Sequence, residues 1–278
     1  MARGDPEAPV NPWEGWRSLL FGWGYEDPDV EVRAFPRGRV LAIAAAGETV
    51  SALARAGFEV TGVDINPVQL AYCRARLAGA PAAAGSAERL LAAGRAVLRG
   101  LDPRWRRIEP VIRHGDPAEL LASRRLRGLL AAGLAPLGLL LPGFRHAIPP
   151  RLDRVLLTRL RRGLGRHAPA DNPWAWRLLA GRDELAGDLR APATLVHADV
   201  ADHLEQVPRG WYGGISLSNI LDGPDPRYAS RLEKAVRHAL RPGGVVVSRS
   251  FRQPRPGEDP GPADRSMLWG VIEARRPV

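Results

Sequence analysis

The segment from Val40 to Leu70 constrains the fold of this chain more than any other. A short apolar run over Arg39–Ile43 predicts a buried strand, and Gly47 follows it in a turn. The next residues predict a helix over Glu48–Ala56 and then a second strand over Phe58–Val63. A strand, turn, helix and strand in this order build a parallel sheet, which binds its ligands beyond the carboxyl ends of the strands.

The rest of the chain extends the same alternation of strands and helices. Asn66 and Pro67 predict the start of a further helix, because Asn caps a helix well and Pro suits the first helical position. That helix should continue to about Ala78. Further strands are predicted over Ala193–Ala198, Gly214–Leu217, Gly244–Phe251 and Met267–Ala274, with a helix over Asp225–Leu240 that Arg241-Pro242-Gly243-Gly244 should end.

The segment between Ser86 and Arg182 differs in character, because it is rich in Leu, Ala and Arg and carries no convincing strand pattern. We therefore expect one cofactor-binding domain, built from residues 39–85 and 183–278, with a helical insertion over residues 86–182 that binds an acceptor or acts as a lid. Residues 1–38 should form an aromatic and acidic cap in front of the first strand.

Composition narrows the partners and the compartment. The formal net charge is +10, yet Lys234 is the only lysine among 40 basic residues, a pattern that a GC-rich genome produces as readily as selection for a basic surface. We expect peripheral contact with an anionic membrane as one use of this charge, and we do not expect a nucleic-acid partner. Cys73 is the only cysteine, which excludes an internal disulfide and a Cys-rich zinc site. A cytoplasmic protein without a metal is the expectation.

The turn after the first strand points to the cofactor. Its sequence, Ala44-Ala45-Ala46-Gly47-Glu48, lacks the three glycines that bring a backbone close to a pyrophosphate, which disfavours a dinucleotide. S-Adenosylmethionine has no phosphate, so one glycine suffices for the chain to pass near it. Asp64 is placed to accept both ribose hydroxyls, although a strand-final Asp also caps helices. Ala45, Ile65 and Asn66 should lie beside it.

Polar residues after two later strands complete the predicted cofactor site. Asp199 should face the adenine amino group. Ser218 and Asn219 should lie at the methionyl end, with a turn-forming Ser-Asn pair as the alternative interpretation. The sequence therefore predicts an α/β chain with the Rossmann-like fold of S-adenosylmethionine-dependent methyltransferases, a mostly parallel, doubly wound sheet with a large helical insertion.

Several blocks together carry a family resemblance. They are Phe21-Gly22-Trp23-Gly24-Tyr25-Glu26-Asp27-Pro28, Val40-Leu41-Ala42-Ile43-Ala44-Ala45-Ala46-Gly47, Val63-Asp64-Ile65-Asn66-Pro67-Val68-Gln69-Leu70, Leu217-Ser218-Asn219-Ile220-Leu221-Asp222 and Asp264-Arg265-Ser266. With them the chain resembles the betaine-lipid synthase family, whose members transfer the 3-amino-3-carboxypropyl group of S-adenosylmethionine to diacylglycerol. The compact length and the composition favour a second group with this chemistry, the aminocarboxypropyl transferase of nocardicin biosynthesis, which alkylates a phenol of a soluble antibiotic.

The resemblance implies roles for further residues. The product would be methylthioadenosine, and the protein must grip the ammonium and carboxylate of the methionyl end. Glu26 and Asp27 are predicted to pair with the ammonium and Arg265 with the carboxylate, each with a surface charge as the alternative. The acceptor is a small-molecule hydroxyl, and its proton needs a base. The candidate catalytic residues are Asp222, His146 and Tyr25.

Two other functions stay open at this point. A small-molecule methyltransferase would share every cofactor feature and differ only in which carbon reacts. A non-catalytic protein could use the same fold to bind RNA or a membrane, and the basic stretches Arg124–Arg127 and Arg159–Arg162 of the insertion suit a membrane interface.

Overall fold

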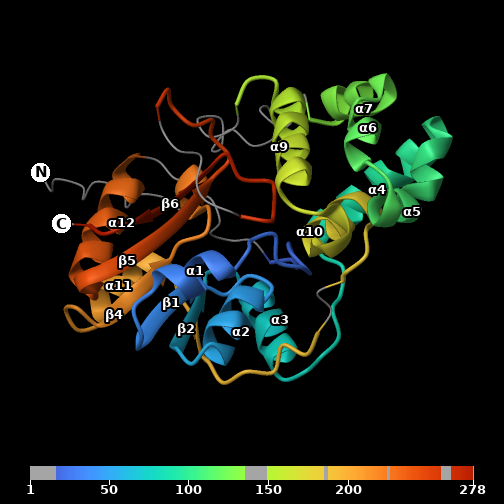
Figure 1. The fold of residues 1–278 in the computed structure, drawn as a ribbon. Coiled ribbons are helices and arrows are strands. Elements are labelled where there is room, and N and C mark those ends of the chain that lie inside the picture. The colour runs from blue at the N-terminus through green and yellow to red at the C-terminus, as the bar shows by residue number, and fades with distance from the viewer. Residues whose placement is uncertain (1–16, 135–148, 185–186, 224–225, 258–263, 278) are drawn as a thin grey trace, which may run out of the picture.

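A six-stranded sheet organises the chain (Figure 1). The structure is a computed structural model, and it describes residues 17–134, 149–184, 187–223, 226–257 and 264–277. The strand order is β3-β2-β1-β4-β5-β6, in which the first five strands run parallel and β6 pairs antiparallel with β5. The strands are β1 (Arg39–Ile43), β2 (Glu59–Asp64), β3 (Thr194–His197), β4 (Tyr212–Ser216), β5 (Leu240–Ser250) and β6 (Val271–Arg275). This confirms the predicted α/β class and mostly parallel sheet.

Helices cover both faces of the sheet because successive side chains of each strand point to opposite faces. On one face Leu41, Ile215 and Val246 pack against α11 (Val200–Gln206) and α12 (Pro226–Ala239). On the other face Val40, Ala42 and Val247 pack with α1 and α2, while Ala44 packs against α3. These three helices are α1 (Asp29–Ala34), α2 (Glu48–Arg55) and α3 (Pro67–Leu77).

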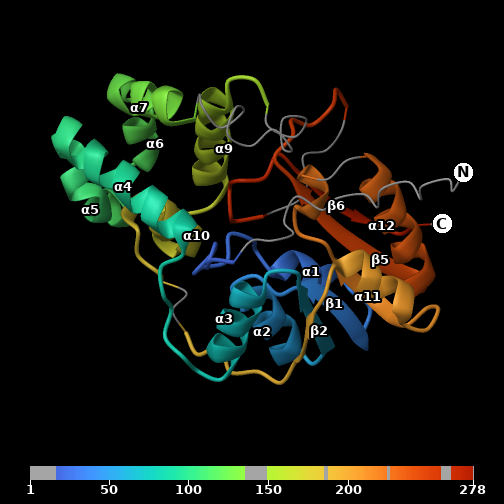
Figure 2. The same cartoon turned by 180° about the vertical axis from the view of Figure 1, so that it is seen from behind.

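The described part of residues 86–182 is helical, as predicted, and its helices stand together to one side of the sheet (Figures 1 and 2). Its longest helices are α4 (Ser86–Leu101) and α9 (Leu152–Arg166), which share a separate apolar cluster that includes Trp105, Trp174 and Trp176. The shorter elements are η1 (Pro103–Arg107), α5 (Ile108–His114), α6 (Pro117–Leu121), α7 (Arg124–Leu134), η3 (Pro169–Asp171), α10 (Pro173–Ala175) and the π-helical turn η4 (Trp176–Ala180). No helix in the described ranges is long and apolar enough to cross a membrane.

Two strand boundaries differ from the sequence prediction. The Arg241–Gly244 segment does not end the regular structure, because β5 already begins at Leu240, pairs with Tyr212 and then shifts register before Val245. Gly243, with φ of 74°, supplies the irregular backbone that this shift needs. The last strand begins only at Val271, because Met267 has left the sheet and packs in the apolar cluster of the insertion.

Candidate functional site

The carboxyl ends of four neighbouring strands surround one pocket of about 710 Å³, its open mouth included. Ile43 and Ala45 come from the end of β1, and Asp64 from the end of β2. Ala198 follows β3, and Asn219 follows β4. The remaining lining residues are Leu20, Phe21, Val63, Ile65, Asn66, Gln69, Asp199, Val200, Ile220 and Tyr228. The pocket lies where parallel sheets bind ligands, beyond the carboxyl ends of the strands.

Two backbone amides hold the carboxylate of Asp64 in place. Its Oδ2 accepts a hydrogen bond from the Ala45 amide at 3.1 Å, and its Oδ1 accepts one from the Asn66 amide at 2.9 Å. Burial raises the pKa of this carboxyl to about 6, against the lowering effect of the two amides. Each oxygen keeps acceptor capacity, so the carboxylate can receive two further donors, such as neighbouring hydroxyls.

The two amide donors hold Asp64 because the sequence shapes both loops. Ala45 has φ of 41°, a left-handed conformation that turns its amide toward the carboxylate. Asn66 caps α3 as predicted, since its side chain accepts from the amides of Val68 at 3.0 Å and Gln69 at 3.4 Å. The strand-final Asp and the Asn-Pro helix start therefore form one connected unit.

Gly47 has a different role from the one expected. It does not line the pocket, and a β-carbon built on it would lie 3.3 Å from the Cys73 Sγ on α3. Its φ of 90° lies in the left-handed region, which glycine adopts without strain. Gly47 therefore turns the chain from β1 into α2 and lets α3 pack closely, and it does not give a ligand access to the backbone.

Asp199 lines the pocket, and its carboxylate accepts hydrogen bonds from other groups of the protein. Its Oδ1 accepts from the Ala201 amide at 2.7 Å and so caps α11. Both oxygens accept from the Tyr228 hydroxyl, at 2.9 and 2.8 Å. These contacts fix the carboxylate at the pocket end away from β1, and Tyr228 lines the same end.

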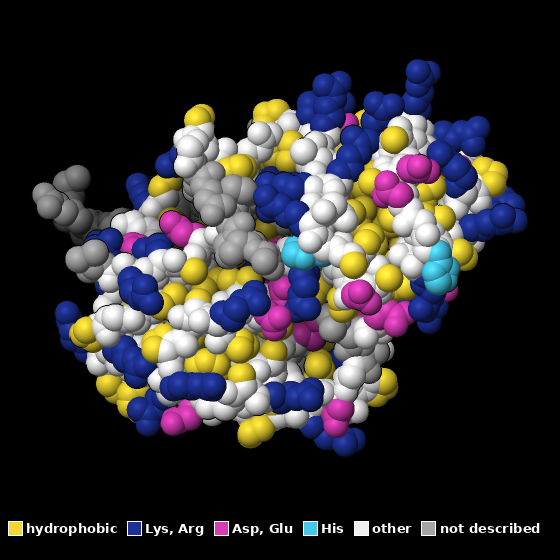
Figure 3. All heavy atoms as spheres, viewed as in Figure 1, with side chains coloured by type: hydrophobic (Ala, Val, Ile, Leu, Met, Phe, Trp, Pro, Cys, Tyr) yellow, Lys and Arg dark blue, Asp and Glu magenta, His cyan; other side chains and the backbone are white. Residues whose placement is uncertain are grey.

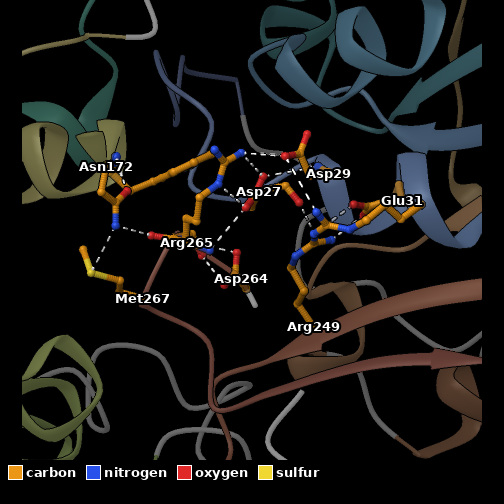
Figure 4. Close-up of polar contacts among 11 residues, drawn as sticks. Asp27, Asp29, Glu31, Asn172, Arg249, Asp264, Arg265 and Met267 are labelled. Atoms are coloured by element: carbon orange, nitrogen blue, oxygen red, sulfur yellow. Dashed lines mark hydrogen bonds and ion pairs between the residues drawn. The ribbon is translucent and has the colours of Figure 1, made fainter. Parts of the chain in front are cut away.

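Charged side chains, most of which Figure 4 shows, gather next to Ser218. Ser218 has φ of 52°, and its hydroxyl donates to Glu26. Arg249 is fully buried, donates to both oxygens of Glu31 at 2.5 and 2.9 Å, and lies 3.5 Å from Glu26. We call the following residues the charged cluster: Glu26, Asp27, Glu31, Arg249, Asp264 and Arg265.

The charged cluster holds more carboxyls than guanidinium groups. Burial raises the pKa of Glu26 and of Asp264, although the Arg249 guanidinium acts in the opposite direction on both. Another positive group beside these two carboxyls would favour their ionised forms. The cluster adjoins the pocket because the Ser218 hydroxyl donates to Glu26 and the next residue, Asn219, lines the pocket.

Asp27 and Arg265, predicted as partners of a ligand ammonium and a ligand carboxylate, form an ion pair with each other. The guanidinium donates to both Asp27 oxygens at 2.7 and 2.8 Å and to Asp29 at 2.9 Å. Burial alone would raise the pKa of Asp27, but the Arg265 contacts outweigh it and hold that pKa below its ordinary value. This pairing could not be predicted from the sequence, because the two residues are 238 positions apart.

The candidate catalytic residues do not meet at the pocket. Asp222 accepts from the Ser250 hydroxyl at 2.5 Å and from the Phe251 amide at 2.9 Å, and it lines a different pocket beside β5 and β6. The Tyr25 hydroxyl donates to Glu88 at 2.9 Å, and burial followed by the Glu88 charge raises its pKa. Neither side chain lines the Asp64 pocket, so their catalytic roles stay predictions from the sequence. His146 lies outside the described residues.

Two functional positions escaped the sequence interpretation. Gln69 is buried and connects the loops around the pocket, since it accepts from the amides of Leu20 and Phe21 and donates to the carbonyls of Phe21 and Ala45. Its place in the Asp64–Leu70 block was the available signal. Arg249 is the other, and its signal was a cation in the middle of an apolar strand, where charges are rarely buried without partners.

The chain was compared with protein-family models and with curated proteins. Neither the protein-family models nor the curated proteins contain a match to the chain. Over the described residues no group of three or more His, Cys, Asp or Glu side chains is arranged to hold a metal ion.

Proposed function

We propose that this chain is an S-adenosylmethionine-dependent transferase that moves the 3-amino-3-carboxypropyl group to an acceptor hydroxyl and releases methylthioadenosine. The observation that carries the proposal is the Asp64 carboxylate, fixed by two backbone amides in a pocket at the carboxyl ends of β1, β2, β3 and β4. This is the position at which a carboxylate can accept both hydroxyls of a ribose. The methyltransferase-like fold predicted from the sequence is part of the same proposal.

Different pocket residues would contact different parts of the ligand. Asp64 would hold the ribose, while the apolar side chains of Ile65, Val200 and Ile220 would enclose the adenine ring near Asp199. The turn from β1 into α2 has no glycine array for a pyrophosphate, which favours a nucleoside without phosphates.

The charged cluster supports transfer of the longer group. Its surplus of carboxyls adjoins the pocket at Ser218 and Asn219, and Glu26 and Asp264 are the two of these carboxyls whose pKa is raised. A ligand ammonium placed there would be held by charge-assisted hydrogen bonds. In this proposal Glu26 binds the ligand ammonium, as predicted from the sequence. Asp264 is its second partner in place of Asp27, because Asp27 forms an ion pair with Arg265.

The chemistry comes from the sulfonium of the co-substrate: the acceptor oxygen bonds to the γ carbon, the bond from that carbon to sulfur breaks, and sulfur keeps the electron pair. The acceptor hydroxyl releases its proton to water, and the resulting oxyanion is the group that attacks the carbon. The protein contributes position, because a fixed methionyl end presents one of the three activated carbons to the acceptor. We propose a phenol of a small specialised metabolite as the acceptor, with diacylglycerol as the second candidate. A phenol with a pKa of about 10 gives up its proton more readily than an aliphatic alcohol does.

Product analysis tests this function. The chain would be incubated with S-adenosylmethionine and either a para-substituted phenol or diacylglycerol, and the products would be measured by mass spectrometry. The expected result is methylthioadenosine together with an acceptor heavier by the aminocarboxypropyl group. S-Adenosylhomocysteine with a methylated acceptor would instead establish a methyltransferase and overturn the proposed group transfer.

A further inference from the structure

A further pocket, which three arginines line in part, lies between the insertion and the sheet, away from Asp64. It encloses about 640 Å³, its open mouth included, and its lining comes from α9 and from the segments next to β5 and β6. The lining residues are Arg154, Val155, Thr158, Arg159, Arg162, Gln253, Pro254 and Gly270. None of them lines the Asp64 pocket.

Three arginines of α9 face this pocket because of their helical spacing. Arg154, Thr158 and Arg162 are four residues apart in succession, so they form one row along the helix, and Arg159 lies beside that row. Arg154 and Arg162 are exposed at the surface. Figure 3 shows basic side chains gathered over the helices of the insertion.

The acidic residues around α9 do not neutralise these arginines. Within the described residues, no ion pair to a carboxylate joins Arg154, Arg159 or Arg162. Asp153, the acidic residue of α9 itself, pairs with Arg151 at 2.8 Å. Asp222 acts on Arg159 through its charge, without an ion pair.

Arg159 fixes the floor of the pocket. Its side chain is buried, and its guanidinium donates to the carbonyls of Phe251 at 2.7 Å, Arg252 at 3.1 Å and Leu268 at 2.9 Å. Burial first, and then the neighbouring Arg162, lower the pKa of Arg159 to about 10. A buried cation held only by neutral carbonyls retains a positive potential, which a nearby anion would satisfy.

We propose that this pocket binds the phosphate group of a ligand, with Arg154 and Arg162 as direct partners and Arg159 as the fixed positive charge beneath it. Guanidinium groups bind phosphate oxygens through paired N–H donors, and the long side chains of two arginines about two turns apart on one face of a helix can reach toward a single phosphate between them. The phosphate can belong to a soluble phosphomonoester or to a lipid headgroup. The site does not depend on the cofactor proposal, because it uses other residues and needs no cofactor for binding.

A charge-matched pair of variants tests the site. Phenyl phosphate would be titrated into the full chain by calorimetry without S-adenosylmethionine, and binding to phosphatidylglycerol vesicles would be measured by flotation. The test variant is Arg154→Gln with Arg162→Gln, and the control is Arg74→Gln on α3 with Arg209→Gln after α11. The control residues are likewise exposed, lie outside this pocket, and give the same change of charge.

We expect the test variant to weaken binding at least tenfold and the control to stay within twofold of the parent chain. Loss of phenyl phosphate binding identifies a soluble ligand, and loss of vesicle binding alone identifies a lipid headgroup; either result supports the site. Equal losses in both variants would mean a general effect of charge and would overturn it. So would a parent chain that binds neither probe, whatever the outcome with S-adenosylmethionine.

Discussion

At the scale of single residues, the surroundings of Asp64 could be predicted from the sequence only in part. The sequence located it after a strand and before an Asn-Pro helix start, and both elements form as predicted. The sequence did not predict the second hydrogen bond to Asp64, which comes from the Ala45 amide 19 residues away. That hydrogen bond depends on the positive φ of an alanine. Alanine is not a residue from which that conformation is expected.

Binding of S-adenosylmethionine should depend on pH through Asp64. Its pKa of about 6 means that the carboxyl is largely neutral at pH 5 and ionised at pH 7, and only the ionised form accepts two hydroxyls with charge assistance. The affinity should therefore rise about tenfold from pH 5 to pH 7 in calorimetric titrations. The Asp64→Asn variant should show a flat profile over this range. A parent chain with a flat profile would contradict the role of Asp64.

Glu26 should contribute to affinity only when the ligand carries the amino acid end. The Glu26→Gln variant keeps the size of the side chain and removes its charge next to Ser218. We expect it to bind S-adenosylmethionine about 10–100-fold more weakly, the range for a hydrogen bond to a charged group. Its affinity for methylthioadenosine, which lacks the ammonium, should remain within twofold. Equal losses for the two ligands would place Glu26 away from the ammonium.

At the scale of elements, the insertion is fastened to the sheet by buried arginines. Arg177 in η4 donates to both oxygens of Glu48 at the start of α2, at 2.6 and 2.9 Å, and also to Asp183 and the Gly24 carbonyl. Arg159 of α9 contacts the chain beyond β5 in the same manner. The helical character of the insertion could be predicted from its composition. Its attachment could not, because local periodicity contains no information on partners 129 residues apart.

Removal of this attachment should destabilise the protein strongly. Arg177→Met would leave the buried Glu48 and Asp183 without their partner, which we expect to lower the free energy of unfolding by about 3–5 kcal/mol. Arg182→Met is the matched control, since Arg182 is half-exposed and pairs with the exposed Glu109; its loss should cost less than about 1 kcal/mol. Urea unfolding of the two variants measures both values. Similar values would contradict a structural role for the Arg177 contacts.

At the scale of the whole molecule, the sequence predicted the sheet better than the polar site. The strands were predictable because each is an apolar run between turn residues, and the Rossmann-like order follows from their alternation with helices. The site brings together chain segments from residue 20 to residue 228, so its pairings depend on the complete fold. Arg265 shows the consequence: it looked free for a ligand, but Asp27 lies within hydrogen-bonding distance of it.

Calorimetric titration of S-adenosylmethionine into the parent chain and Asp64→Ala tests the central claim most directly. The account predicts saturable binding of one molecule per chain, weakened by about 1–3 kcal/mol in Asp64→Ala, which is about 5–150-fold. Asp188→Ala, at an exposed carboxyl outside the pocket, should leave the affinity unchanged, and urea unfolding would verify that each variant is folded. A parent chain that does not bind, or an Asp64→Ala variant that binds as tightly as the parent, would contradict the claim.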